Sequence, residues 1–132
     1  MTVMGTCLCG AVRYEIEGPL EMMVHCHCSM CRKHHGTPFS TFVAGPLAGF
    51  RWIAGEKDIM HFASSAQGVR SFCRHCGSAT PSIMEAAGQV GVPAGNLQGD
   101  LGIEPECHIF VGSKAPWYDI TDSLPRFETV AK

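Results

Sequence analysis

Seven of the eight cysteines in this 132-residue chain fall into three tight groups, and this clustering limits the fold more than any other feature. Zinc takes four ligands in a tetrahedron, and two thiolates one or two residues apart on a tight turn supply half of such a site. Thiols that serve only as small buried side chains would not need this spacing. The sequence therefore predicts metal binding by three groups: Cys7/Cys9, Cys26/Cys28/Cys31 and Cys73/Cys76.

Two glycines indicate how these groups combine. Cys9 and Cys76 are each followed directly by a glycine, Gly10 and Gly77. Glycine tolerates the positive φ that lets backbone N–H groups turn toward the sulfur atoms of a zinc-binding turn. Joining the two glycine-terminated turns gives a closed, structural four-thiolate site made of Cys7, Cys9, Cys73 and Cys76.

The three remaining clustered cysteines, Cys26, Cys28 and Cys31, lie on one short segment. Three protein ligands and an exchangeable fourth position are the arrangement of a catalytic zinc. The expected cofactor is therefore two Zn²⁺ per chain. A second pairing stays open on spacing alone: a zinc ribbon of Cys28/Cys31 with Cys73/Cys76, which leaves Cys7, Cys9 and Cys26 without partners.

Composition and charge exclude several classes of function. Apolar residues make up 45% of the chain and charged residues 17%, as in a globular domain, and we expect one domain over residues 1–132. The formal net charge of −2 favours neither nucleic acid nor an anionic membrane. The first ten residues carry no secretory signal, so we expect a cytoplasmic protein with reduced thiols and no membrane partner. The sequence gives no indication of the oligomeric state.

Short β-like runs separated by Pro and Gly predict a mainly β fold of antiparallel sheets. The alternation in Ala11–Glu17 is typical of a half-buried strand. Similar runs are Met22–Cys26, Phe39–Val43, Phe50–Ile53, Asp58–Phe62, Val69–Phe72 and His108–Val111.

At most one or two short helices are expected. Ser29 is a suitable N-cap for a helix over Met30–His35, and Gly36 is a suitable terminator. The segment Ala86–Gly102 carries five Gly and one Pro, which indicates a mobile loop or a hairpin.

Four runs resemble a known family: GTCLCGAVRYEIEG, VHCHCSMCRKHHG, SSAQGVRSFCRHCGSATP and CHIFVGSKAPWYDI. They are similar to the glutathione-dependent formaldehyde-activating enzymes, which share their domain with centromere protein V. The matches extend from the amino terminus to about Leu124. The resemblance implies a zinc-pinned β fold of the Mss4-like type, with Cys26, Cys28 and Cys31 at the catalytic metal. Cys107 stands where the family motif supplies no ligand.

The resemblance also implies a reaction. The family's reference reaction joins glutathione and formaldehyde into S-hydroxymethylglutathione. We therefore expect a zinc-dependent carbon–sulfur lyase that acts on the adduct of a small thiol and a small aldehyde. A zinc with three thiolates is a weak Lewis acid, which favours binding of the incoming thiol. His27, His34 and His35 flank the three cysteines and are the candidates for proton transfer or for a fourth ligand.

Two other functions remain open on the sequence. Thiol redox chemistry of the Mss4-like type would use Cys107, although a strand turns this thiol away from its neighbour His108. The second of these functions is that of a non-catalytic, zinc-stabilised binding module like centromere protein V. The chain has no run of Lys and Arg beyond Arg32–Lys33, which argues against binding to nucleic acid.

Overall fold

The computed structural model describes residues 1–66 and 68–131 and is mainly β, as the sequence predicts. One α-helix, α1, occurs in these residues, and it covers Ser29–His35. The strands are β1 Thr2–Thr6, β2 Arg13–Glu17, β3 Met22–Cys26, β4 Ser40–Pro46, β5 Phe50–Ala54, β6 Ile59–Ala63, β7 Val69–Cys73, β8 Ser82–Met84, β9 Gln89–Pro93 and β10 Cys107–Ile109. Short 3₁₀ turns cover Leu47–Gly49, Glu56–Asp58, Glu85–Ala87, Ala94–Asn96 and Val111–Ser113.

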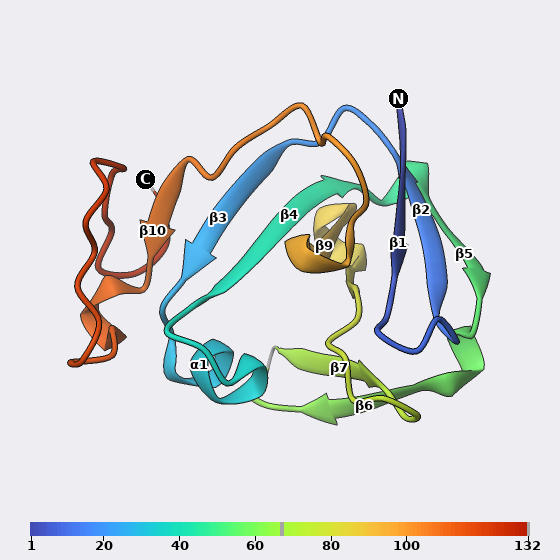
Figure 1. Ribbon diagram of the computed structural model, residues 1–132, viewed down its shortest axis with the longest axis horizontal. Helices are drawn as coiled ribbons and strands as arrows, with labels where there is room; N and C mark the ends of the chain where they lie inside the picture. The colour runs from blue at the N-terminus through green and yellow to red at the C-terminus, as the bar shows by residue number, and fades with distance from the viewer. Residues whose placement is uncertain (67, 132) are drawn as a thin grey trace.

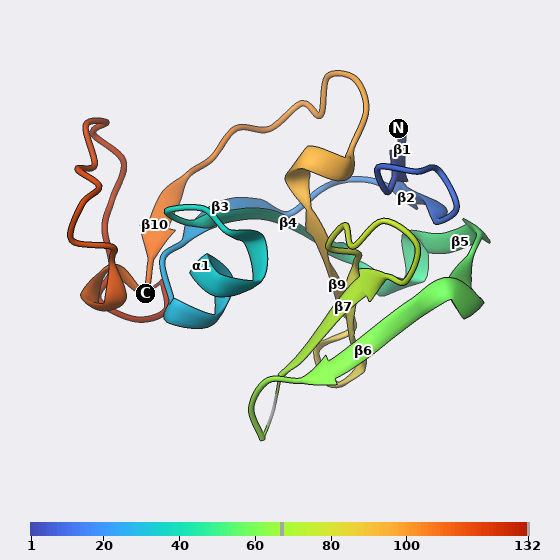
Figure 2. The ribbon, with the colours of Figure 1, turned by 60° about the horizontal axis from the view of Figure 1, so that its bottom comes forward.

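The strands form three sheets within the described residues (Figure 1). The first has the order β1-β2-β5 and the second the order β10-β3-β4-β9-β8, while β6 and β7 form a separate hairpin. All pairs are antiparallel except β10 with β3, which run parallel, so the expectation of antiparallel sheets holds with this one exception. Figure 2 shows the β6–β7 hairpin extending away from the other two sheets and passing beneath α1.

The main core fills the space between the first and second sheets. Its buried side chains alternate along the strands, as one-sided burial of a sheet requires. They are Val3, Tyr14, Ile16, Leu20, Met23, Val43, Val90 and Val92. Smaller clusters hold the hairpin against the β1–β2 loop and hold α1 against β3 and β10.

Three features differ from the sequence-based expectation: β1, β8 and the N-cap of α1. The strands β1 and β8 match none of the predicted runs. In the segment expected as a mobile loop or a hairpin, β9 forms a hairpin with β8 and also pairs with β4. The alternation of buried Val90 and Val92 within that segment is the strand signal, and neighbouring Gly and Pro residues obscure it. The N-cap of α1 is Cys28 and not Ser29, because the Cys28 Sγ accepts the backbone N–H of Cys31 at 3.3 Å. Gly36 ends the helix in the left-handed conformation, as expected.

Every helix in the described part of the chain is too short or too polar to cross a lipid bilayer.

Candidate metal centres

Four cysteines meet where the β6–β7 hairpin contacts the loop between β1 and β2. The Cys7 and Cys9 Sγ atoms are 3.7 Å apart, and those of Cys9 and Cys73 are 3.9 Å apart. The Cys76 Sγ completes a group whose four sulfur atoms all lie within 4.8 Å of one another. Tetrahedral zinc with Zn–S bonds of about 2.3 Å places its sulfurs about 3.8 Å apart, whereas a disulfide needs about 2.05 Å. The donor set and its spacing therefore fit a closed four-thiolate metal site.

Backbone and hydroxyl groups stabilise negative charge on these sulfurs. The N–H of Val12 lies 3.3 Å from the Cys7 Sγ, and the N–H of His75 lies 3.4 Å from the Cys73 Sγ. The side chain and the backbone N–H of Ser78 lower the pKa of Cys76 to about 5. Gly10 and Gly77, which follow two of the ligands, have φ of +83° and +77°. Their conformation is the one expected for glycine-terminated zinc-binding turns.

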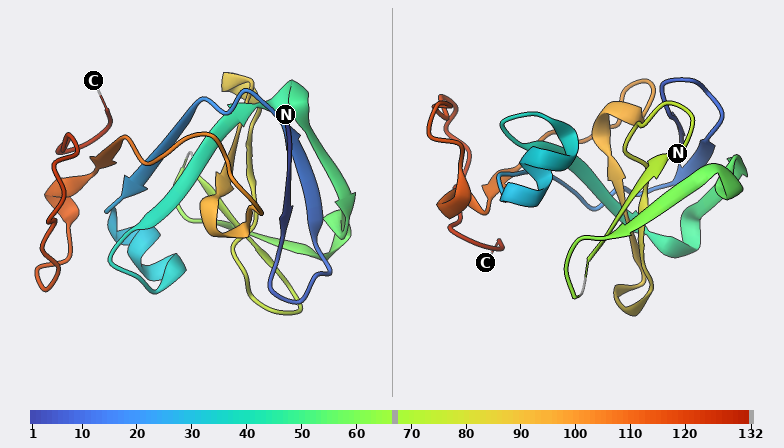
Figure 3. Two further views of the ribbon diagram at one scale, coloured as in Figure 1. Left: turned by 45° about the horizontal axis from the view of Figure 1, so that its top comes forward. Right: turned by 90° about the horizontal axis from the view of Figure 1, so that it is seen from below.

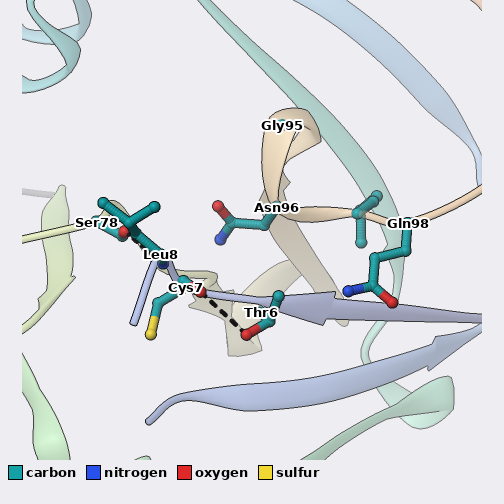
Figure 4. A pocket seen from close by; sticks show the side chains of 8 residues that line it. Thr6, Cys7, Leu8, Ser78, Gly95, Asn96 and Gln98 are labelled. Carbon is teal, nitrogen blue, oxygen red and sulfur yellow. Dashed lines mark hydrogen bonds between the residues drawn. The ribbon is translucent and has the colours of Figure 1, made fainter. Parts of the chain in front are cut away.

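A hollow of about 430 Å³ lies beside this four-cysteine centre (Figure 4). Thr6, Cys7, Leu8 and Ser78 line it together with residues 95–98, and the backbone N–H of Leu8 donates to the Ser78 Oγ at 2.9 Å. Every thiol at this centre belongs to the closed group of four. We therefore assign the hollow no part in the chemistry.

Cys26, Cys28 and Cys31 form a second group whose sulfurs also lie within 4.8 Å of one another. Cys26 is the last residue of β3, where it lies between Ser40 of β4 and Ile109 of β10. Cys28 caps α1 and Cys31 lies in its first turn, so one strand end and one helix start supply all three sulfurs. Within the described residues this group has no fourth cysteine, and the zinc-ribbon pairing of Cys28/Cys31 with Cys73/Cys76 does not form.

The hairpin strand β7 sends Arg70 to this three-cysteine centre. The Arg70 Nη1 donates to the Cys31 Sγ at 3.2 Å, and Nη2 lies 3.8 Å from the Cys28 Sγ. The neighbouring Cys26 thiol and the Arg70 guanidinium lower the pKa of Cys31 to about 4. Three thiolates around one divalent ion leave one formal negative charge, which the guanidinium of Arg70 balances. This set of donors fits a metal bound by three thiolates.

Replacement of Arg70 by Met should weaken metal binding at the three-cysteine centre alone. The change keeps a long side chain but removes two N–H groups from the sulfur atoms, and loss of such an outer partner typically reduces metal affinity about 10-fold or more. We expect zinc to leave this centre about 10-fold faster in a chelator-dye assay, with release from the four-cysteine centre unchanged. Arg13→Met, on the exposed face of β2, is the matched control. Equal release rates in wild type and Arg70→Met would contradict this role.

The three candidate histidines occupy different environments. His34 and His35 are half-buried at the end of α1 with ring centroids 4.8 Å apart. Burial lowers the pKa of both imidazoles, and the Cys31 thiolate acts on both in the opposite direction. His27 is fully buried, and burial together with the nearby rings of His108 and His25 lowers its pKa to about 4. Burial therefore favours the neutral form of all three rings.

His27 belongs to a hydrogen-bonded chain that reaches the carboxyl-terminal segment. The His27 Nε2 lies 2.8 Å from the His108 Nδ1, and the His108 Nε2 lies 3.0 Å from the Asp122 Oδ2. Phe39 packs against both rings, with centroid distances of 4.9 Å to His27 and 5.9 Å to His108. No local pattern in the sequence predicts these hydrogen bonds, because His27 and His108 lie 81 residues apart.

Cys107 lies outside both groups of converging sulfurs. It packs against Val24, Cys26 and Cys31 in an apolar cluster, and burial raises the pKa of its thiol. His108, the next residue of β10, turns to His27 on the other side of the strand. The separation of Cys107 from His108 follows the alternation of side chains along a strand.

Comparison with known proteins adds a family to this geometry. A sequence profile of the family described as "Glutathione-dependent formaldehyde-activating enzyme" matches residues 2–113. A Halomonas elongata protein named "Putative glutathione-dependent formaldehyde-activating enzyme" is 28% identical over 128 residues, which cover 91% of this chain and 82% of that protein. A Schizosaccharomyces pombe protein named as an uncharacterized lyase is 32% identical over 76 residues, which cover 56% of this chain and 52% of that protein.

A solved structure shares the fold. The crystal structure of a Rhodobacter sphaeroides protein matches with a TM-score of 0.62 and 27% sequence identity, over 77% of this chain and 97% of that one.

Proposed function

The chain belongs to the family of glutathione-dependent formaldehyde-activating enzymes, and on that premise we propose that it is a zinc-dependent carbon–sulfur lyase. Its substrate is the adduct of a small thiol with a small aldehyde, and the reference reaction joins glutathione to formaldehyde. In this proposal residues 1–132 form one domain that binds two Zn²⁺ and works in the cytoplasm. The observation that carries the proposal is the difference between the two cysteine groups, one closed by four thiolates and the other with three.

In this proposal Cys7, Cys9, Cys73 and Cys76 hold a structural zinc, and Cys26, Cys28 and Cys31 hold the catalytic one. Held by Cys26, Cys28 and Cys31, a zinc ion would favour the deprotonated form of a substrate thiol at this centre. Arg70 keeps the Cys28 and Cys31 sulfurs in place and balances their charge. Both roles of Arg70 follow from its contacts with these two sulfur atoms.

The reaction requires one proton to move. The thiol S–H bond breaks, a carbon–sulfur bond forms at the carbonyl carbon, and the carbonyl oxygen ends as a hydroxyl group. Among His27, His34 and His35, the last two are the better candidates to hold this proton, because the charge of Cys31 acts on both. His27 is instead engaged by His108. A neutral imidazole close to the centre can accept the thiol proton and return it to the oxygen.

The proposal is tested by measuring the exchange between glutathione, formaldehyde and their adduct by NMR. We expect the zinc-loaded protein to accelerate exchange about 100-fold or more over the spontaneous reaction, as general acid–base catalysis does, and a chelator to abolish the effect. A wild type that holds both zinc ions and gives no acceleration would contradict the lyase assignment.

Cys107→Ser separates this chemistry from a thiol redox reaction. The thiol is buried and its pKa is raised, so it is a poor nucleophile. We expect Cys107→Ser to keep the full exchange rate. A loss of activity in a folded Cys107→Ser protein would favour the redox alternative.

A further inference from the structure

The segment that follows residue 113, where the match to the family profile ends, contacts β10 through the hydrogen bond of Asp122 with His108. Residues 125–129 lie along β10, where the His108 N–H donates to the Pro125 carbonyl and the Phe127 N–H donates to the His108 carbonyl, each at 2.9 Å. Figure 3 shows this segment at the outer edge of the molecule beside β10. Asp122 is held in turn, because the Leu124 N–H donates to its Oδ1 at 3.0 Å.

The carboxylate of Asp122 sets the direction of the hydrogen bonds behind it. An ionised carboxylate can only accept, and hydrogen bonding from His108 and from the Leu124 N–H lowers the pKa of Asp122, so His108 donates from Nε2. When His108 carries its one ring hydrogen on Nε2, its Nδ1 accepts, and His27 donates to it from Nε2. The series of hydrogen bonds from Asp122 through His108 thus selects one tautomer of His27, with the hydrogen on Nε2 and a lone pair on Nδ1. The Nδ1 atom is buried and has no hydrogen-bond partner within residues 1–66 and 68–131.

His27 is also the residue between two sulfur ligands. Its backbone N–H donates to the Ile109 carbonyl at 3.0 Å, and its fully buried ring is fixed by His108. The backbone and the side chain of His27 are thus both hydrogen-bonded to β10. His27 lies in the turn between the end of β3 at Cys26 and the start of α1 after Cys28. Because the ring is fully buried, a change in its orientation would require the atoms packed around it at this turn to move.

We propose that Asp122 and His108 are positioning residues for the three-cysteine centre. They hold the His27 ring in one tautomer and one orientation, and thereby hold the turn that carries the Cys26 and Cys28 sulfurs. The carboxyl-terminal segment is then part of the site, although the family profile matches residues 2–113 only. This inference rests on the proposed function only in requiring that the three-cysteine centre binds a metal.

The first test reads the tautomer of His27 in the full-length, zinc-loaded protein labelled with ¹⁵N-histidine. Long-range ¹H–¹⁵N correlation should show the hydrogen on Nε2 in wild type. Asp122→Ala should populate both tautomers, because either ring can then donate to the other. Asp122→Asn should restore the wild-type pattern, since the amide oxygen still accepts from His108. Asp119→Ala, an exposed neighbour, is the matched control.

The second test measures zinc release from the same proteins. We expect release from the three-cysteine centre to be about 10-fold faster in Asp122→Ala, in the range for loss of an outer-shell partner, with the four-cysteine centre unchanged. A wild-type His27 with its hydrogen on Nδ1 would overturn the inference, as would unchanged zinc release in Asp122→Ala. A protein that passes both tests and still does not accelerate adduct exchange would contradict the lyase proposal alone.

Discussion

Cys73→Ser should leave the protein without a cooperative fold. Cys73 is fully buried on β7, and its sulfur connects the hairpin to the Cys7–Cys9 loop of the first sheet. Structural zinc contributes about 10–16 kcal/mol to the folding of small zinc domains, which matches or exceeds the whole stability of a typical domain, about 5–15 kcal/mol. We expect far-UV circular dichroism at 25 °C to show a mainly unfolded chain with no melting transition.

Cys107→Ser is the matched control for this loss of fold. It makes the same exchange of sulfur for oxygen at a buried position, but outside the four-cysteine centre. Burial of a hydroxyl there costs about 1–3 kcal/mol, so the protein should melt cooperatively at a reduced temperature. If Cys73→Ser melts at the same temperature as Cys107→Ser, the four-cysteine centre does not hold the fold together.

Cys28→Ser should abolish the exchange activity and preserve the fold. The change removes one of three thiolates from the three-cysteine centre, but serine is a favourable N-cap and can accept the Cys31 N–H that the Cys28 sulfur now accepts. The helix therefore keeps its cap while the metal loses a ligand. We expect adduct exchange at the spontaneous rate in a protein that keeps its far-UV circular dichroism spectrum and still melts cooperatively.

The neighbouring exposed residue provides the control for Cys28→Ser. Ser29→Ala alters the same turn without touching a sulfur ligand, and should retain wild-type exchange. Residual acceleration in Cys28→Ser equal to that of Ser29→Ala would mean that the three-cysteine centre does not carry the reaction.

The grouping of the cysteines could be predicted from the sequence because it depends on local spacing. Two glycines after Cys9 and Cys76 were enough to favour the pairing that the structure brings together. A turn that binds a metal is built from neighbouring residues, so the spacing of its ligands can be recognised in a single sequence. The mainly β fold could be predicted for the same reason, because alternation is a local pattern.

The support around the three-cysteine centre could not be predicted in this way. Arg70 reaches Cys31 from 39 residues away, and His108 reaches His27 from 81 residues away. Only the pairing of β10 with β3 and the passage of the hairpin beneath α1 bring these groups together (Figure 2). Neither contact has a periodicity or spacing of its own in the sequence.

In the proposed function two unlike zinc centres divide structure from chemistry, and zinc content per folded chain tests this division most directly. Atomic absorption on purified protein should give two zinc ions for wild type and for Cys107→Ser, and one for Cys28→Ser with its circular dichroism spectrum intact. A wild type that holds a single zinc, or a Cys28→Ser protein that keeps both ions or loses its fold with the metal, would contradict this division.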